Sequence, residues 1–295
     1  MRYEKWIKKN TSTLKGKTVA ITGATGGLGR QICRYIVSLG GSLILIDRNG
    51  ERSLALKGEL LKEFVHVEIQ NITLDLEDIA MAEKVCRELE KSSPDIFIHN
   101  AAGYSIPRKK CETGFDNVFQ INFVTPYFIT RRMLKINPEI KIIAVGSIAH
   151  RYSVTDPEDT DFSTRTASSL VYGNSKRYLM CALWELFREK GGLSVVHPGI
   201  TFTNITAHYP PWLFTIIKQP MKVIFMKPEK AALCVVKGIF EQSGYCEWLG
   251  PRIFDIWGLP HKSKVRGCKE NERKRIFETS EEIYLGLEKR YAEKM

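Results

Sequence analysis

The sequence lacks the features that mark several large classes of protein. No apolar stretch of its 295 residues approaches the roughly 20 that a membrane-spanning helix needs. The charged N-terminus has no apolar signal-peptide core. The seven cysteines are scattered, odd in number and free of any Cys-x-x-Cys pair, which argues against a disulfide framework and against a zinc site. We therefore expect no membrane span, no metal centre and a reducing, cytoplasmic setting.

Acidic residues are too few to balance the basic ones. Lys and Arg number 44 against 33 Asp and Glu, a net charge of +11, and part of the excess lies in residues 1–17 and 262–275. A basic surface attracts nucleic acid, anionic membranes or anionic ligands. Because no nucleic-acid-binding motif accompanies the charge, we expect solvated basic ends and no nucleic-acid partner.

A glycine-rich turn stands near the start of the chain, between a predicted strand and a predicted helix. Residues 17–22 form a short β-branched, apolar run, which indicates a buried strand, and from Leu28 onward apolar residues recur at helical spacing. Such a unit presents free N–H groups and the positive end of a helix dipole to an anion, as in dinucleotide-binding folds. The candidate cofactor-binding residues of this turn are Thr22, Gly23, Thr25, Gly26, Gly27, Leu28 and Gly29.

A second predicted strand, Ser42–Asp47, ends in an acid about twenty residues beyond the glycines. In dinucleotide-binding folds an acid at this place hydrogen-bonds the 2′-hydroxyl of the adenosine ribose; the alternative is a carboxylate that only caps a turn. Arg48 follows and suits a 2′-phosphate, which Asp47 would repel. We therefore expect NAD in preference to NADP.

Strands and helices alternate along the chain, which predicts an α/β fold of the Rossmann type. We expect a doubly wound, mostly parallel sheet of seven strands, with helices on both faces, in a single domain over residues 1–295. Asp75, beside Leu76, is expected either to edge the adenine pocket or to cap the helix that ends at Lys91. Small residues that follow a strand, Asn100, Ala101 and Ala102, leave space for a ligand. The other predicted strands are 67–74, 95–103, 140–145, 193–196 and 247–251, and the other predicted helices are 52–64, 115–134, 170–190, 228–242 and 270–292.

A tyrosine and a lysine stand four residues apart in a predicted helix, at Tyr172 and Lys176, and therefore lie on the same face. A neighbouring ammonium group favours the phenolate, so we expect Lys176 to lower the pKa of Tyr172 toward neutrality. Such a pair is also common on surface helices that have no catalytic role. Ser147, at the end of a predicted strand, and Asn122, in the preceding predicted helix, favour the catalytic interpretation.

Taken together, these motifs resemble those of the short-chain dehydrogenase/reductase family, in its shorter, single-domain branch. The resemblance covers about residues 15–260 and implies an NAD(P)-dependent oxidoreductase that interconverts a secondary alcohol and a carbonyl on a mainly apolar small molecule. Members commonly form homodimers or homotetramers. The motifs are Thr22-Gly23-x3-Gly27-x-Gly29, His99-Asn100-Ala101-Ala102, Asn122, Ser147, Tyr172-x3-Lys176 and Pro198-Gly199-x3-Thr203.

The resemblance implies a task for each of these residues. Tyr172 is the implied general acid of reduction and base of oxidation, and Lys176 is implied to lower its pKa and to bond the nicotinamide ribose. Ser147 is implied to hold the carbonyl oxygen as charge develops. Asn122 is implied to position a water that links Lys176 to solvent. Four further residues are implied to border the nicotinamide: Pro198, Gly199, Ile200 and Thr203.

Some departures keep other interpretations open. His99 replaces the first Asn, and Ala102 the Gly, of the family's usual Asn-Asn-Ala-Gly. Gly26 also completes Thr-Gly-x2-Gly-x2-Gly, the spacing of the longer branch of nucleotide-sugar epimerases and dehydratases. The Pro-Gly-x3-Thr segment, the short C-terminal part and the insertion 150–169, which resembles retinol-dehydrogenase-like members, favour the shorter branch. A non-catalytic cofactor-sensing or scaffolding protein is the alternative from a different class.

Residues 204–227 take the place of the family's mobile substrate lid, and from residue 207 they are unusually apolar. Three interpretations stay open: packing on the core or on a second subunit, an apolar substrate pocket, or peripheral contact with a membrane. The C-terminal extension, 262–295, is predicted to contain an amphipathic helix that docks on its own domain or on a partner.

Overall fold

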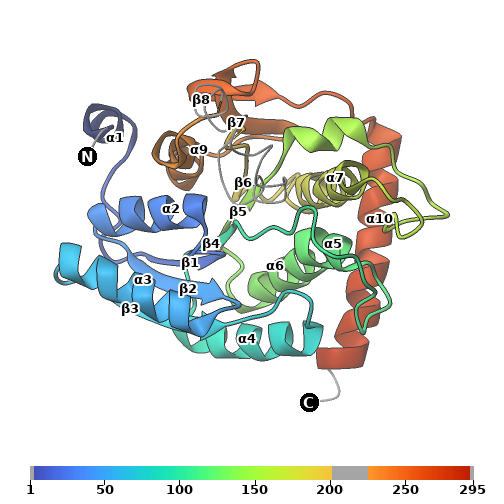
Figure 1. The fold of residues 1–295 in the computed structure, drawn as a ribbon, viewed down its shortest axis with the longest axis horizontal. Helices are drawn as coiled ribbons and strands as arrows, with labels where there is room; N and C mark the ends of the chain where they lie inside the picture. Colours follow the sequence, from blue (N-terminus) through green and yellow to red (C-terminus); the bar gives the residue numbers. More distant parts are fainter. Residues whose placement is uncertain (1–2, 201–224, 293–295) are drawn as a thin grey trace, which may run out of the picture.

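The computed structural model describes residues 3–200 and 225–292. Within these ranges the chain forms one eight-stranded sheet in the order β3-β2-β1-β4-β5-β6-β7-β8 (Figure 1). All neighbouring strands run parallel except β8, which runs antiparallel to β7. The strand order reverses between β1 and β4, as the doubly wound prediction requires. The strands are β1 (Thr18–Thr22), β2 (Ser42–Asp47), β3 (Ile69–Thr73), β4 (Ile96–His99), β5 (Lys141–Val145), β6 (Leu193–Val196), β7 (Glu247–Ile253) and β8 (Trp257–Lys264).

Helices cover both faces of the sheet. One hydrophobic core packs α2, α3 and α9 against the first face, and the other packs α4, α6, α7 and α10 against the second. In the described part of the chain, no helix is both long and apolar enough to cross a bilayer. The helices are α1 (Glu4–Asn10), α2 (Gly27–Ser38), α3 (Gly50–Glu63), α4 (Ile79–Ser92), α5 (Asn117–Phe119), α6 (Thr125–Ile136), α7 (Ser168–Leu186), α9 (Pro228–Phe240) and α10 (Glu270–Leu287).

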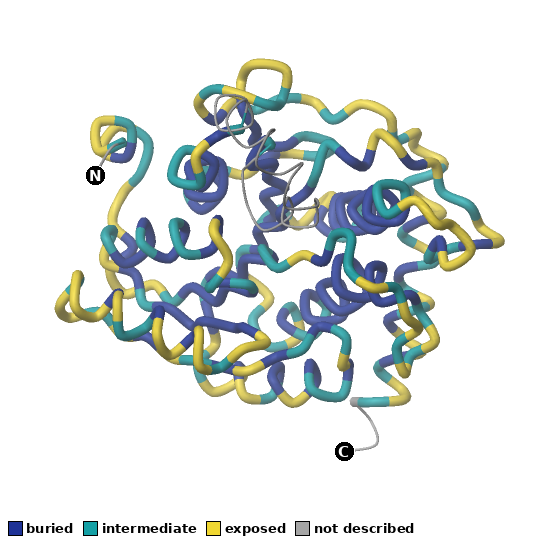
Figure 2. The backbone as a smooth tube through the Cα atoms, in the orientation of Figure 1, coloured by how far each residue is buried: buried dark blue, intermediate teal, exposed yellow. Residues whose placement is uncertain are grey.

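The central strands are buried along nearly their whole length (Figure 2). Every residue of β1 after Thr18, and every residue of β2 after Ser42, is buried. Parallel strands with helices on both faces read as continuous apolar runs, which is why the sequence located them well. The predicted strands Ser42–Asp47 and Leu193–Val196 have these bounds in the structure.

The predicted count of seven strands is wrong, because β8 adds an eighth. This strand pairs with β7 through a hairpin with a register shift between Pro251 and Ile253. Its sequence contains glycine, proline and two lysines, and most of its residues are exposed or half-buried. An edge strand needs no continuous apolar run, so it lacked the pattern by which the other strands were recognised.

The predicted helix 115–134 is interrupted. A short helix, α5, leads into one π-helical turn, η1 (Gln120–Val124), before α6 begins. All five residues of η1 are buried, and Asn122 is one of them. Short π-helical turns inside α-helices are frequent at functional sites.

The C-terminal helix α10 docks on its own domain, which is one of the two alternatives that the sequence predicted. It packs against α7 and α6, and its buried residues Ile276, Tyr284 and Leu287 belong to the core of that face. Glu281 on α10 pairs with Arg131 on α6 at 2.5 Å. A helix distant in sequence from the glycine turn therefore braces the helix that carries Tyr172.

Candidate active site

The glycine-rich turn is closed so tightly that two of its glycines have no room for a side chain. Gly23 has φ +68°, and a Cβ added there would lie 2.9 Å from the Cα of Ala101. A Cβ added to Gly29 would lie 2.2 Å from the carbonyl oxygen of Gly23. Helix α2 begins directly after this turn, with Gly26 at its N-cap and no side chain bonded to its first N–H groups. The turn thus leaves a helix N-terminus suited to an anion.

Asn100 braces the turn from the neighbouring strand. Its amide donates to the carbonyl oxygens of Thr22 and Gly23, both at 3.0 Å. The Thr22 hydroxyl accepts in turn from the N–H groups of Asn100 and Ala101 at 3.2 Å. The residue that departs from the family pattern, His99, is buried and lies 2.8 Å from the Thr130 hydroxyl. Asn100 and Ala101 therefore lie against the glycine turn, and Ala102 follows them at the same edge of the sheet; the predicted space for a ligand beside them stays a prediction.

Asp47 ends β2 beside the same turn. One carboxylate oxygen accepts from the N–H and the hydroxyl of Thr25, at 3.2 and 2.9 Å. The other, Oδ2, is buried and has no hydrogen-bond partner among the described residues. Burial raises the pKa of Asp47, and the hydrogen bonds from Thr25 offset part of the rise. An unpartnered carboxylate oxygen at this place fits the ribose hydroxyl of a dinucleotide. Arg48, beside it, is exposed.

Asp75 does not cap the next helix, which was one of the two predictions for it. The N-cap of α4 is Asp78, whose carboxylate accepts from the Met81 N–H at 2.8 Å. The carboxylate of Asp75 instead accepts from the N–H of Glu77. Leu76 is buried, and its carbonyl oxygen accepts from the Thr125 hydroxyl at 2.6 Å. The alternative place of Asp75, at the edge of an adenine pocket, stays a prediction.

The structure brings Ser147, Tyr172 and Lys176 together. Ser147 follows β5, and its side chain lies close enough to the phenol of Tyr172 on α7 to act on the pKa of that phenol. The Lys176 ammonium group lies 5.7 Å from the centre of the Tyr172 ring. It donates to the carbonyl oxygen of Val145, the last residue of β5, at 2.9 Å. The helical spacing of four residues therefore places the phenol and the amine side by side, as predicted.

The pKa of Tyr172 departs from its ordinary value in the direction opposite to the prediction. Burial raises it to about 12, although the neighbouring Ser147 side chain acts to lower it. Burial also lowers the pKa of Lys176 to about 7. The sequence showed that the two groups are neighbours but not that both are desolvated. With these values the phenol keeps its proton at neutral pH, and the amine titrates there.

Asn122 lies in the π-helical turn η1 and is fully buried. Its amide nitrogen donates to the carbonyl oxygens of Gly103 and Val118, both at 2.8 Å. Its amide oxygen has no hydrogen-bond partner in residues 3–200 and 225–292. An orphaned acceptor of this kind suits a water molecule, which is the task that the resemblance implied for Asn122.

Sequence reasoning missed the apolar wall beside Tyr172. The Tyr104 ring meets the Tyr172 ring edge to face, with centroids 5.1 Å apart. Phe162, from the loop after Ser147, is buried in the same small cluster, and Ile106 packs against it. These residues lie in irregular segments, where no periodicity marks a buried position.

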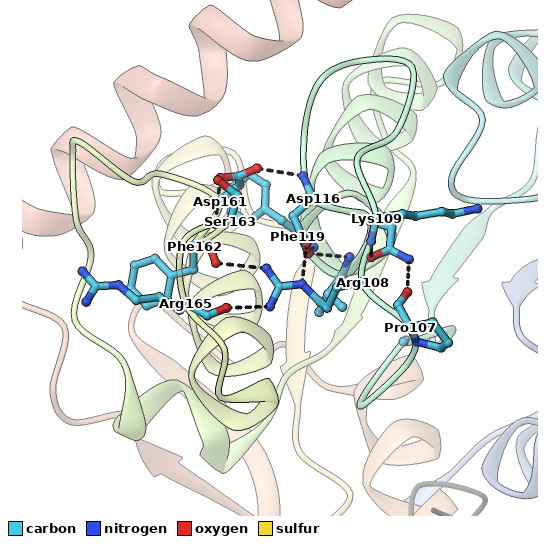
Figure 3. Close-up of polar contacts among 12 residues, drawn as sticks. Pro107, Arg108, Lys109, Asp116, Phe119, Asp161, Phe162, Ser163 and Arg165 are labelled. Atoms are coloured by element: carbon cyan, nitrogen blue, oxygen red, sulfur yellow. Dashed lines mark hydrogen bonds and ion pairs between the residues drawn. The ribbon is translucent and has the colours of Figure 1, made fainter.

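Arg108 holds the two loops of this wall together (Figure 3). Its guanidinium group pairs with the Asp116 carboxylate and donates to the carbonyl oxygens of Phe162 and Arg165, each at 3.0 Å. Asp116 caps α5, and its N–H donates to Asp161 at 2.7 Å. Loop 104–116 and loop 153–167 are therefore fixed relative to each other. No spacing in the sequence indicated this contact.

The Pro-Gly segment after β6 is described only in part. Gly199 has φ +77°, and a Cβ there would lie 2.7 Å from the carbonyl oxygen of Ile256, so glycine is required. Pro198 is buried. The carbonyl oxygen of Ile200 accepts from the Met226 N–H at 2.9 Å. Thr203 and most of the predicted lid, residues 204–224, lie outside the described residues.

Comparisons with known proteins agree with this geometry. The family description "short chain dehydrogenase" matches residues 17–156. Retinol dehydrogenase 14 of Mus musculus is 29% identical over 214 residues, 66% of this chain and 64% of that protein, so the alignment spans just under two thirds of that relative. Retinol dehydrogenase 13 of Homo sapiens is 27% identical, with 94% of this chain and 87% of that protein covered.

A solved structure shares the fold. An uncharacterised protein from Mycobacterium paratuberculosis superposes with a TM-score of 0.72 at 20% identity and covers 94% of this chain and 96% of its own. The glycine turn, the arrangement of Ser147, Tyr172 and Lys176, and these relatives all indicate similarity to the same family. Residues 17–156 are similar to the short chain dehydrogenase family, and the chain is similar to retinol dehydrogenases 13 and 14.

Proposed function

We propose that this chain is an NAD(P)-dependent oxidoreductase that interconverts a secondary alcohol and a carbonyl on a mainly apolar small molecule by hydride transfer. One observation carries the proposal: the Ser147 side chain and the Lys176 amine both lie beside the phenol of Tyr172, with the amine 5.7 Å from the centre of its ring. A non-catalytic protein on this fold would have no need of these three groups in contact.

The residues at the carboxyl edge of the sheet fit a dinucleotide cofactor. The N–H groups at the start of α2, from Gly27 to Gly29, would hold the pyrophosphate, and the free Oδ2 of Asp47 would accept from the ribose hydroxyl. The cofactor supplies or accepts the hydride. We favour NAD over NADP, because the Asp47 carboxylate would repel a 2′-phosphate even with Arg48 beside it.

In the proposed reduction, Ser147 donates a hydrogen bond to the carbonyl oxygen of the substrate and Tyr172 gives that oxygen its proton. A phenol with a pKa of about 12 is protonated at neutral pH, which suits a proton donor. Lys176, with a pKa of about 7, gains and loses a proton near neutrality. A water held by the amide oxygen of Asn122 would carry protons between Lys176 and solvent.

The substrate class is proposed from the wall beside the phenol. Tyr104, Ile106 and Phe162 pack with Tyr172 and make the surroundings of its ring apolar. Two relatives carry the name retinol dehydrogenase, so retinol and retinal join the apolar alcohols and ketones to be tested first. We also propose a cytoplasmic setting, as expected from the sequence.

The test follows NADH and NADPH absorbance with the full chain against retinoid, steroid, aldehyde and short ketone panels. Turnover of an apolar carbonyl or alcohol is the expected result. Absence of turnover, together with thermal stabilisation by a sugar nucleotide, would favour the epimerase or dehydratase alternative. Absence of both, with cofactor binding intact, would favour the cofactor-sensing protein.

A further inference from the structure

Arg177, the residue after Lys176, is a buried cation that joins three segments. Its side chain is only 4% exposed. It donates to the Glu272 carboxylate on α10 from Nε at 2.7 Å and from Nη2 at 2.5 Å. Nη1 donates to the carbonyl oxygen of His150 at 3.1 Å, and Nη2 also donates to that of Gly267. The guanidinium group thus links α7, the turn after Ser147 and the start of α10.

His150 carries this link to Ser147. Its side chain is fully buried, with Nδ1 2.7 Å from the carbonyl oxygen of Ser147 and Nε2 3.2 Å from that of Arg266. The N–H of His150 also donates to the Ser147 carbonyl oxygen, at 3.2 Å. The edge of the ring meets Trp248, with centroids 5.4 Å apart. His150 therefore contacts the carbonyl oxygen of Ser147 both through its ring and through its backbone N–H.

We propose that Glu272, Arg177 and His150 are positioning residues that set the place of the Ser147 hydroxyl, so that the C-terminal helix is part of the active-site framework. The inference rests on the proposed function, in which Ser147 contacts the substrate. Ser147 is the N-cap of a short 3₁₀ turn, η2 (Ile148–Tyr152), and the hydrogen bonds of 3₁₀ turns have poorer geometry than those of an α-helix. A displacement of about 1 Å at a reacting group costs up to about 100-fold in rate, so external fixation of this turn matters.

The structure contains a matched control for this link. The neighbouring residue on α10, Arg273, pairs with Glu185 on α7 at 3.3 Å. Both ion pairs join α7 to α10, and both are largely buried. The Arg273 side chain, however, bonds Tyr245 and the carbonyl oxygen of Cys268, not the turn that follows Ser147. The two pairs differ in what they hold rather than in which helices they join.

The experiment compares Glu272→Gln with Glu185→Gln in the full chain. Glutamine keeps the shape and an acceptor oxygen, including that for the Thr155 hydroxyl, but removes the charge that fixes the arginine. We expect similar losses of melting temperature in both. Only E272Q should lower kcat, by about 10-fold with little change in the KM for NADH, and only E272Q should speed amide hydrogen exchange in residues 146–152.

A second pair of variants tests His150. In the His150→Asn variant the side-chain amide nitrogen would occupy nearly the place of the imidazole Nδ1, so this variant should restore most of the kcat that His150→Ala loses. Equal kcat and equal exchange in E272Q and E185Q, or no rescue by H150N, would overturn the inference. Amide hydrogen exchange can be measured whether or not the chain turns over a substrate. A wild-type chain that is inactive on every panel while the exchange contrast persists would refute the proposed function and leave the link to Ser147 standing.

Discussion

Two regions meet at the carboxyl edge of the sheet, and they are fixed in different ways. The glycine turn and Asp47 belong to one continuous strand-helix-strand unit, and the Asp47–Thr25 contact joins residues only 22 positions apart. The turn after Ser147 depends on distant parts of the chain. Its contacts run through Arg177 to Glu272, 95 positions further on, and through His150 to Arg266, 116 positions further on.

The two regions differ in whether backbone groups or side chains would do the work of the proposed site. In the glycine-turn region the backbone would form the proposed cofactor site, because Gly23 and Gly29 allow a close approach and helix α2 begins directly after the turn. In the Ser147 region side chains would form the proposed site, and burial shifts the pKa values of Tyr172 and Lys176. Substitutions in the glycine-turn region should therefore change stability and cofactor binding. Substitutions in the Ser147 region should change the rate of turnover.

The largest expected effect is on the glycine turn. A Cβ at Gly29 would lie 2.2 Å from a backbone oxygen, so Gly29→Ala should lower the free energy of unfolding by about 3 kcal/mol and abolish NADH binding. Gly58, inside α3, has nothing within 4 Å of an added Cβ, and Gly58→Ala should stabilise by about 0.5–1 kcal/mol. Denaturant unfolding measures the free energy of unfolding of both variants, and NADH fluorescence measures cofactor binding. Tight NADH binding by G29A would contradict this view of the turn.

Removal of the buried amine should separate stability from activity. Because the native pKa of Lys176, about 7, is below its unfolded value of about 10.4, the unfolded chain binds more protons between these values. The resulting destabilisation is full below pH 7 and fades as pH rises toward 10.4. Lys176→Met should therefore raise the free energy of unfolding by about 1–3 kcal/mol at pH 6, and by less at pH 9, while turnover is lost.

Lys141, at the opposite end of β5, is the control for this variant. Burial lowers its pKa to about 8, and its amine donates to the carbonyl oxygen of Ile239 at 2.8 Å, far along the strand from Ser147. Lys141→Met should keep turnover within about twofold of the wild type. Urea unfolding at the two pH values and steady-state rates compare the two methionine variants. Normal turnover by K176M would remove Lys176 from the proposed chemistry.

The smallest expected effect concerns cofactor choice. Asp47→Asn keeps the shape of the side chain but removes the charge that would repel a 2′-phosphate, so the preference for NADH over NADPH should fall by about 10-fold, or about 1.4 kcal/mol. Arg48→Gln should act in the opposite direction. Dissociation constants of both cofactors, measured by fluorescence, decide this. An unchanged ratio in D47N would show that Asp47 does not read the ribose.

The strand, turn and acid of the glycine-turn region could be predicted, because their signals are local, but the brace from Asn100, 77 and 78 positions away, could not. The strand Ser42–Asp47 and the acid at its end stand at fixed distances from the glycines. The neighbours Tyr172 and Lys176 followed from helical spacing alone. The direction in which the Tyr172 pKa shifts could not be predicted in this way. It depends on burial by residues that are remote in sequence, such as Tyr104.

The remaining contacts had no local signal. Arg108 reaches Phe162 across 54 positions, and Arg177 reaches Glu272 across 95, both without a periodic pattern. The eighth strand, β8, lies at the sheet edge, where polar residues are tolerated. Such features arise from tertiary packing, which can place any pair of charges together, so the sequence named the reacting groups but not what holds them.

The most direct test of the account replaces Tyr172 with Phe, which removes one oxygen atom and keeps the ring against Tyr104. Turnover of the substrate identified in the panels should fall by about 10²–10⁴-fold, while the dissociation constant for NADH and the melting temperature stay close to those of the wild type. A Y172F variant that retains turnover would contradict the assignment of Tyr172 as the proton donor.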